Sequence, residues 1–188
     1  MALLTLAEAK AQLDITTGAE DAELEAYIEA LTAPIERIVG PVEIRSFTET
    51  VEGRSASLCL SKIPAVALVS VVPAVDDGDP LELSRLHLDG ATGIVRYRGG
   101  SFAGTLWTVT YTAGRAAVPA ETPPTINLAA RILLQHLWRT QYGASRGLTG
   151  VGGGDDYSVT EPIPGFGYAI PNRVLQLLEP YKVPPGVA

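Results

Sequence analysis

The sequence has little of the chemistry on which disulfide-bonded, metal-binding and membrane proteins rely. Its single cysteine, Cys59, cannot form a disulfide within the chain. Its two histidines, His87 and His136, have no carboxylate or thiol neighbours at metal-ligand spacing, so we predict neither a metal site nor a bound cofactor. No apolar run approaches the length of a membrane span, and no basic patch followed by an apolar stretch opens the sequence. We therefore expect no disulfide, metal, membrane segment or secretion signal.

Basic residues are also too few, and too scattered along the sequence, to form a stripe. The formal net charge is −7, and residues 1–40 carry eight acidic residues against two basic ones, a net charge of −6. A protein that grips nucleic acid presents a stripe of lysines and arginines, because each contact neutralises a phosphate. We predict that DNA can pass near this protein without being bound tightly.

Helical periodicity marks three segments of the chain. Thr5 followed by Glu8 is the signature of a capping box and predicts a helix over residues 5–13. A second helix is predicted over 21–39 and a third over 125–142. The second has an apolar stripe of Leu24, Ile28, Leu31, Ile35 and Ile38. The third has a broad apolar face of Ile126, Ala130, Leu133, Leu134, Leu137 and Trp138.

Between about residues 43 and 113 the apolar period changes to two. In "WTVTYTAG", Trp107, Val109 and Tyr111 share one face, which is typical of a half-buried antiparallel strand. "LDGATGIV" predicts a hairpin turn between two further strands. Cys59 alternates with leucines in "SLCLS", and we expect it to be a small, buried strand residue.

These segments predict an α+β fold with a mainly helical core. Two N-terminal helices and the long central helix form the core in residues 1–142, and the strands form a small antiparallel β insertion over about 43–113. Residues 143–188 form an extended arm that ends in a short helix, "NRVLQLLEPY". Long stretches without periodicity, such as the beginning of this arm, are usually functional or disordered.

The arm begins with a glycine-rich stretch, "RGLTGVGGGDDY". A phosphate loop would precede a helix and carry a lysine, whereas these glycines follow a helix and are followed by Asp155 and Asp156. We interpret Gly147–Gly154 as a mobile joint. The apolar residues beyond it are predicted to bind a neighbouring subunit or partner. They are Ile163, Phe166, Tyr168 and Ile170 in the arm, and Leu175 and Leu178 in the terminal helix.

No catalytic constellation is visible. Ser61 and His136 could be imagined as parts of a triad, but His136 belongs to a helix that we expect to be buried. No serine occupies a G-x-S-x-G elbow. We predict that the protein is not an enzyme.

Three stretches together resemble one known family. They are "LLTLAEAKAQLDI…AEDAELEAYIEALTAPIERIVG", then the β-rich insertion, then "VTYTAGRAAVPAETPPTINLAARILLQHLWRTQYG". Their order and spacing over roughly residues 3–143 resemble the head-to-tail connector proteins of long-tailed bacteriophages, also called adaptor or head-completion proteins. The arm and the terminal helix are not matched residue for residue.

The resemblance implies a structural, non-enzymatic subunit of the virion neck, assembled in the cytoplasm of the bacterial host. Its helical cores would pack into a homo-oligomeric ring, of twelve subunits in that family, beneath the portal protein. The ring would extend the DNA channel and dock a head stopper or tail-completion protein. Two alternatives stay open: another neck or tail protein, such as a head stopper or tail terminator, and a small hydrolase with a glycine-rich lid.

Overall fold

The computed structural model describes residues 3–75, 78–142 and 170–183. The chain divides into two compact units. One comprises Met1–Val39 and Pro119–Lys182, and the other is built on Gly40–Val118. The predicted Gly147–Gly154 joint lies outside the described residues.

The first unit is helical and begins with α1 (Leu6–Leu13) and α2 (Asp21–Val39). The predicted capping box is confirmed: the Thr5 hydroxyl accepts the Glu8 backbone N–H at 3.2 Å. Lys10 Nζ donates to Asp21 Oδ1 at 2.6 Å and so links α1 to the first turn of α2. The apolar stripe of α2 is buried at Leu24, Ile28, Leu31 and Ile35. At the end of α2, Val39 is buried, whereas Ile38, which was predicted as part of the stripe, is only half-buried. Ile38 and Val39 are three and four positions beyond Ile35, and residues at either spacing can continue the same apolar stripe.

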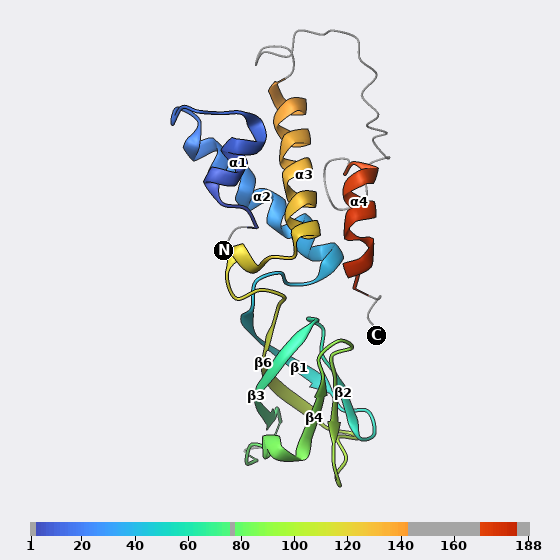
Figure 1. The fold of residues 1–188 in the computed structure, drawn as a ribbon. Coiled ribbons are helices and arrows are strands. Elements are labelled where there is room, and N and C mark those ends of the chain that lie inside the picture. The colour runs from blue at the N-terminus through green and yellow to red at the C-terminus, as the bar shows by residue number, and fades with distance from the viewer. Residues whose placement is uncertain (1–2, 76–77, 143–169, 184–188) are drawn as a thin grey trace. The chain divides into compact units, whose positions relative to one another are not determined.

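The centre of the helical unit is α3 (Pro124–Tyr142), which packs against α1, α2 and α4 (Asn172–Leu178) (Figure 1). Its predicted apolar face is buried throughout: Ile126, Ala130, Leu133, Leu134, Leu137 and Trp138. The Trp138 ring meets the Tyr27 ring of α2 edge to face, with 5.6 Å between the ring centroids. Two short 3-10 helices, Pro119–Glu121 and Glu179–Tyr181, precede α3 and follow α4.

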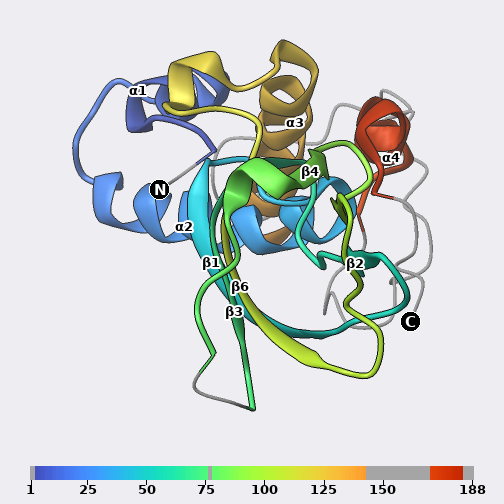
Figure 2. The same ribbon diagram turned by 90° about the horizontal axis from the view of Figure 1, so that it is seen from below.

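The second unit contains two antiparallel sheets of three strands. In the first, β6 (Leu106–Ala113) lies between β1 (Arg45–Glu52) and β3 (Ala65–Pro73) (Figure 2). Its pairing with β1 runs without interruption from Arg45↔Ala113 to Glu52↔Leu106. The pairing with β3 is irregular at Val66 and Val69, which are exposed. Such bulges on an edge strand hinder pairing with strands of other molecules.

In the second sheet, β5 (Ile94–Tyr97) lies between β2 (Ser57–Cys59) and β4 (Leu86–Asp89). The predicted hairpin is confirmed, since β4 and β5 pair from Leu86↔Tyr97 to Asp89↔Ile94 around the "GATG" turn. A short 3-10 helix, Leu83–Arg85, leads into β4. Cys59 is exposed, so the expectation of a buried cysteine is wrong. Alternation places Leu58 in the core and therefore turns Cys59 to the opposite face.

The two sheets share one apolar core. Val109 and Tyr111 of β6 are fully buried in it, as the strand pattern predicts, with Trp107 at the edge. Phe102 lies between two aromatic rings, 5.3 Å from Tyr97 and 5.4 Å from Trp107 between ring centroids. Each sheet thus buries an apolar face inside this unit, without a need for helices.

The predicted fold class is therefore wrong in its proportions. The chain is not a mainly helical core with a small β insertion. Its described residues form four α-helices and two three-stranded antiparallel sheets, and the strands make up a compact unit of their own. The physical reason is the aromatic and aliphatic core of the β unit, which makes its strands a second centre of stability.

Candidate functional site

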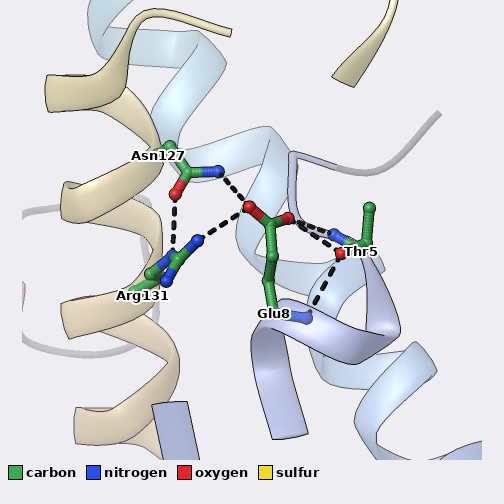
Figure 3. A network of polar contacts seen from close by, with 4 residues as sticks. All are labelled: Thr5, Glu8, Asn127 and Arg131. Atoms are coloured by element: carbon green, nitrogen blue, oxygen red, sulfur yellow. Dashed lines mark hydrogen bonds and ion pairs between the residues drawn. The ribbon is translucent and has the colours of Figure 1, made fainter. Parts of the chain in front are cut away.

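A polar network joins α1 to α3 through the two oxygens of one carboxylate, Glu8 (Figure 3). Oε2 accepts the Thr5 N–H at 2.8 Å and the Thr5 hydroxyl at 2.9 Å. Oε1 accepts Asn127 Nδ2 at 3.1 Å and Arg131 Nη2 at 2.8 Å. Arg131 Nε also donates to Asn127 Oδ1 at 2.7 Å, which fixes the guanidinium. One residue thus caps α1 and fastens it to the central helix.

The surroundings of Glu8 favour its charged form. Partial burial alone would raise the pKa of Glu8, but the bonds from Thr5, Asn127 and Arg131 outweigh it, and the pKa is lowered. A carboxyl group with a lowered pKa in the folded state stabilises the fold above its unfolded pKa. That stabilisation is lost as the pH falls through the folded pKa.

Replacing Arg131 tests this network. We expect Arg131→Ala to lower the free energy of unfolding by about 1 kcal/mol at pH 7, since the pair is partly exposed. At an acidic pH low enough to protonate Glu8, the difference from wild type should shrink. Urea unfolding at both pH values measures it. Arg139→Ala, on the same helix and without an ion pair to a described residue, is the control. An equal difference at both pH values would rule out Glu8 as the partner that matters.

A second network lies in the β unit around Glu49 of β1. The Tyr111 hydroxyl donates to Glu49 Oε1 at 2.8 Å and accepts the Lys62 N–H at 3.0 Å. Ser61 donates to the same carboxylate through its N–H and its hydroxyl. Burial, reinforced by the bond to Glu49, raises the pKa of Tyr111 to about 12. The phenol therefore stays protonated near neutral pH and links β6 to β1 and to the loop after β2.

Ser61 and His136 were considered in the sequence as parts of a catalytic triad. The Ser61 hydroxyl donates to the Glu49 carboxylate, whereas the serine of a triad donates to a histidine that a carboxylate orients. Burial lowers the pKa of His136, which favours a neutral imidazole within α3. Among the described residues, no three histidine, cysteine, aspartate or glutamate side chains are grouped as metal ligands would be. Within the same residues, no helix is both long and apolar enough to cross a membrane.

The predicted interface residues have different positions. Ile163, Phe166 and Tyr168 lie outside the described residues. Ile170 and Leu178 are buried, with exposed fractions of 1% and 0%, and so belong to the core of the helical unit in a single chain. Leu175 of α4 is half-buried. An interface role for this set stays a prediction.

Sequence reasoning assigned Glu8 only to the helix cap and missed its contact with α3. The capping box is a local signal, readable from two positions three residues apart. The contacts of Glu8 with Asn127 and Arg131 span 119 and 123 residues. A single sequence carries no local sign of such a contact.

Three comparisons place the chain among known proteins. The model of the Head completion protein family matches residues 2–183. Among curated proteins, none matches the sequence. Several solved structures have the same fold, among them the "Neck of empty GTA particle computed with C6 symmetry", with a TM-score of 0.67 and 22% identity over 99% of this chain and 92% of that one.

Two further similar structures come from the same kind of particle. A chain of the "Virion of native gene transfer agent (GTA) particle" gives a TM-score of 0.64 at 22% identity, over 99% of this chain and 92% of that one. A chain of the "Neck of native GTA particle computed with C12 symmetry" gives 0.60 at 18% identity, over 96% and 90%. At these identities the likeness shows the fold, while the family match over nearly all of the sequence decides the membership: the chain belongs to the head completion protein family, a family of structural proteins.

Proposed function

We propose that the protein is a head-to-tail adaptor, a ring subunit beneath the portal that extends the DNA channel and docks the next neck or tail component. The observation that carries this proposal is the family match over residues 2–183. The fold likeness to chains of two neck reconstructions, over nearly the whole length of both chains, supports it. Two proteins that occupy the same place in a neck should share the fold of both the helical unit and the β unit, and the likeness covers both.

The ring is proposed to contain twelve subunits. The two similar neck structures were computed with C6 and with C12 symmetry. Sixfold symmetry is contained in twelvefold symmetry, so both are compatible with a twelve-membered ring. A closed cyclic ring needs one interface repeated around the axis, in which two different surfaces of the chain meet.

The charge of the chain suits a conduit. Residues 1–40 have a net charge of −6, and a wall with this charge would repel the phosphates of passing DNA. The alternative account is that these acids keep an outer face soluble. On both accounts the protein lets DNA pass without holding it. We place it in the virion neck and expect its assembly in the cytoplasm of the bacterial host.

The partners are proposed to be the portal protein on one side and a head stopper or tail-completion protein on the other. The test mixes the purified chain with the portal ring encoded in the same genome and weighs the complex by native mass spectrometry. We expect the mass of the portal ring plus twelve copies of this chain. Binding to the tail tube without binding to the portal would instead favour a tail terminator.

A further inference from the structure

The outer side of the second sheet gathers three arginines, and a fourth lies at its edge. Arg96 of β5 lies opposite Ser57 of β2, and Ser57 in turn pairs with Arg54 across a tight turn. Residues that face each other across paired strands point to the same side, so Arg54 and Arg96 share one face. Arg98 follows Arg96 by two positions and points the same way.

The fourth arginine, Arg85, adjoins this face. The Arg98 N–H donates to the Arg85 carbonyl at 2.9 Å, one position beyond the last pair of the β4–β5 ladder. The Arg85 guanidinium lies over the Tyr97 ring, 5.1 Å from its centroid, which holds it in place. We call these four residues the arginine surface: Arg54, Arg85, Arg96 and Arg98.

The arginine surface is not neutralised within the described part of the chain. All four side chains are exposed, and none forms an ion pair with a described residue. The one carboxylate on β2, β4 and β5 is Asp89, which accepts the Ala91 N–H at 3.2 Å and the Thr92 hydroxyl at 2.8 Å. Arg85 and Arg98 lie just beyond the ends of β4 and β5, with their backbones joined by a hydrogen bond, and two like charges held this close repel each other. The chain thus carries a local cost that an anionic partner would relieve.

Helix α2 shows the opposite pattern. Glu25 and Glu29 lie one helical turn apart, both are exposed, and neither forms an ion pair with a described residue. Like charges four residues apart destabilise a helix by a few tenths of a kcal/mol. As far as the described residues go, one chain therefore presents a basic surface without ion pairs on its β unit and an acidic pair without ion pairs on its helical unit.

We propose that, in the ring, the arginine surface of one subunit binds Glu25 and Glu29 of the next; this rests on the proposed adaptor function. A cyclic ring joins two different surfaces of the same chain, and these two have complementary charge. The spacing of the charges also agrees. Arg96 and Arg98 are two positions apart in extended chain, which spans about 6.6 Å, and Glu25 and Glu29 are four positions apart in a helix, which spans about 6 Å. Arginine can bind each carboxylate through two parallel hydrogen bonds.

A charge exchange tests the pairing. One variant carries Arg96→Glu and Arg98→Glu, a second carries Glu25→Arg and Glu29→Arg, and a third carries all four changes. Self-association of the full chain is measured by sedimentation equilibrium, and ring formation by native mass spectrometry on portal rings. We expect each of the first two variants to associate at least about tenfold more weakly than wild type, and the third to recover to within about threefold. Lys62→Glu, at an exposed lysine of the β unit outside the arginine surface, is the control and should associate like wild type.

The outcomes separate the pairing from the adaptor role. Rings that form normally from the first two variants would overturn the pairing and leave the adaptor role intact. Charge-dependent self-association without any binding to portal rings would support the pairing and contradict the adaptor role.

Two other results would assign the arginine surface to a different partner. A change in melting temperature that is independent of concentration would mean pairing within one chain. Duplex DNA bound by wild type and lost in Arg96→Glu, Arg98→Glu would assign the surface to phosphate. Either of these last two results would overturn the proposal.

Discussion

Trp138→Ala should lower the free energy of unfolding of the helical unit by about 3–5 kcal/mol. The Trp138 side chain is 7% exposed on the face of α3 that forms the centre of this unit, and its ring meets Tyr27 of α2 edge to face. Removing the ring deletes this contact and leaves a cavity between helices. Urea unfolding followed by far-ultraviolet circular dichroism measures the loss.

The control for this change lies on the same helix. Leu128 is 43% exposed, so Leu128→Ala should cost well under 1 kcal/mol. The chain has two tryptophans, and Trp107 of the β unit remains in the Trp138 variant as a fluorescent reporter of the other unit. A variant that unfolds like wild type but fails to assemble would show that Trp138 is an interface residue and not a core residue.

Phe102→Ala should destabilise the β unit by a similar amount, about 3–5 kcal/mol. Phe102 is fully buried, and its ring lies between those of Tyr97 and Trp107. Its loss removes the contact that joins β5 to β6 through aromatic rings. Trp107 adjoins the resulting cavity, and its fluorescence reports the transition in a Trp138→Phe background, where Trp107 is the one tryptophan left.

The matched control is Leu106→Ala at the start of β6, where the side chain is 42% exposed. It should leave the midpoint of the Trp107 transition almost unchanged. A loss below about 1 kcal/mol in Phe102→Ala would mean that the core of the β unit is centred elsewhere, and it would weaken the view that the strands form a unit with their own stability.

Much of the helical unit could be predicted because its signals are local. The capping box of α1 involves residues three apart, and the apolar faces of α2 and α3 recur every three or four residues. Each signal fits within one helix, so a single sequence contains all of it. The side of α2 that faces the core followed from the positions of Leu24, Ile28 and Leu31 alone.

That the strands form a compact unit of their own could not be predicted in the same way. Short strands are visible through their alternation, but β1 pairs with β6 over more than 50 residues of sequence, as Thr50↔Thr108 illustrates. The core that makes these strands a unit depends on Phe102, which lies in a loop and belongs to no periodic pattern. The sequence alone therefore predicts an insertion into a helical protein where the structure has a separate β unit.

The arginine surface was still harder to predict from the sequence. Along the sequence the basic residues form no stripe, and the arginine surface exists only because a turn and two strand pairings bring Arg54, Arg96 and Arg98 to one face. The alternation in "IVRYR" was the one local sign of it. Family membership, in contrast, followed from the order of whole segments, which a single sequence does contain.

We propose that this chain forms the ring directly beneath the portal, and electron cryomicroscopy of purified particles, or of necks isolated from them, tests this proposal most directly. We expect density for twelve copies of this chain in contact with the portal, with neighbouring copies joined between the β unit of one and α2 of the next. A chain found in the tail, or one separated from the portal by another ring, would contradict the adaptor role.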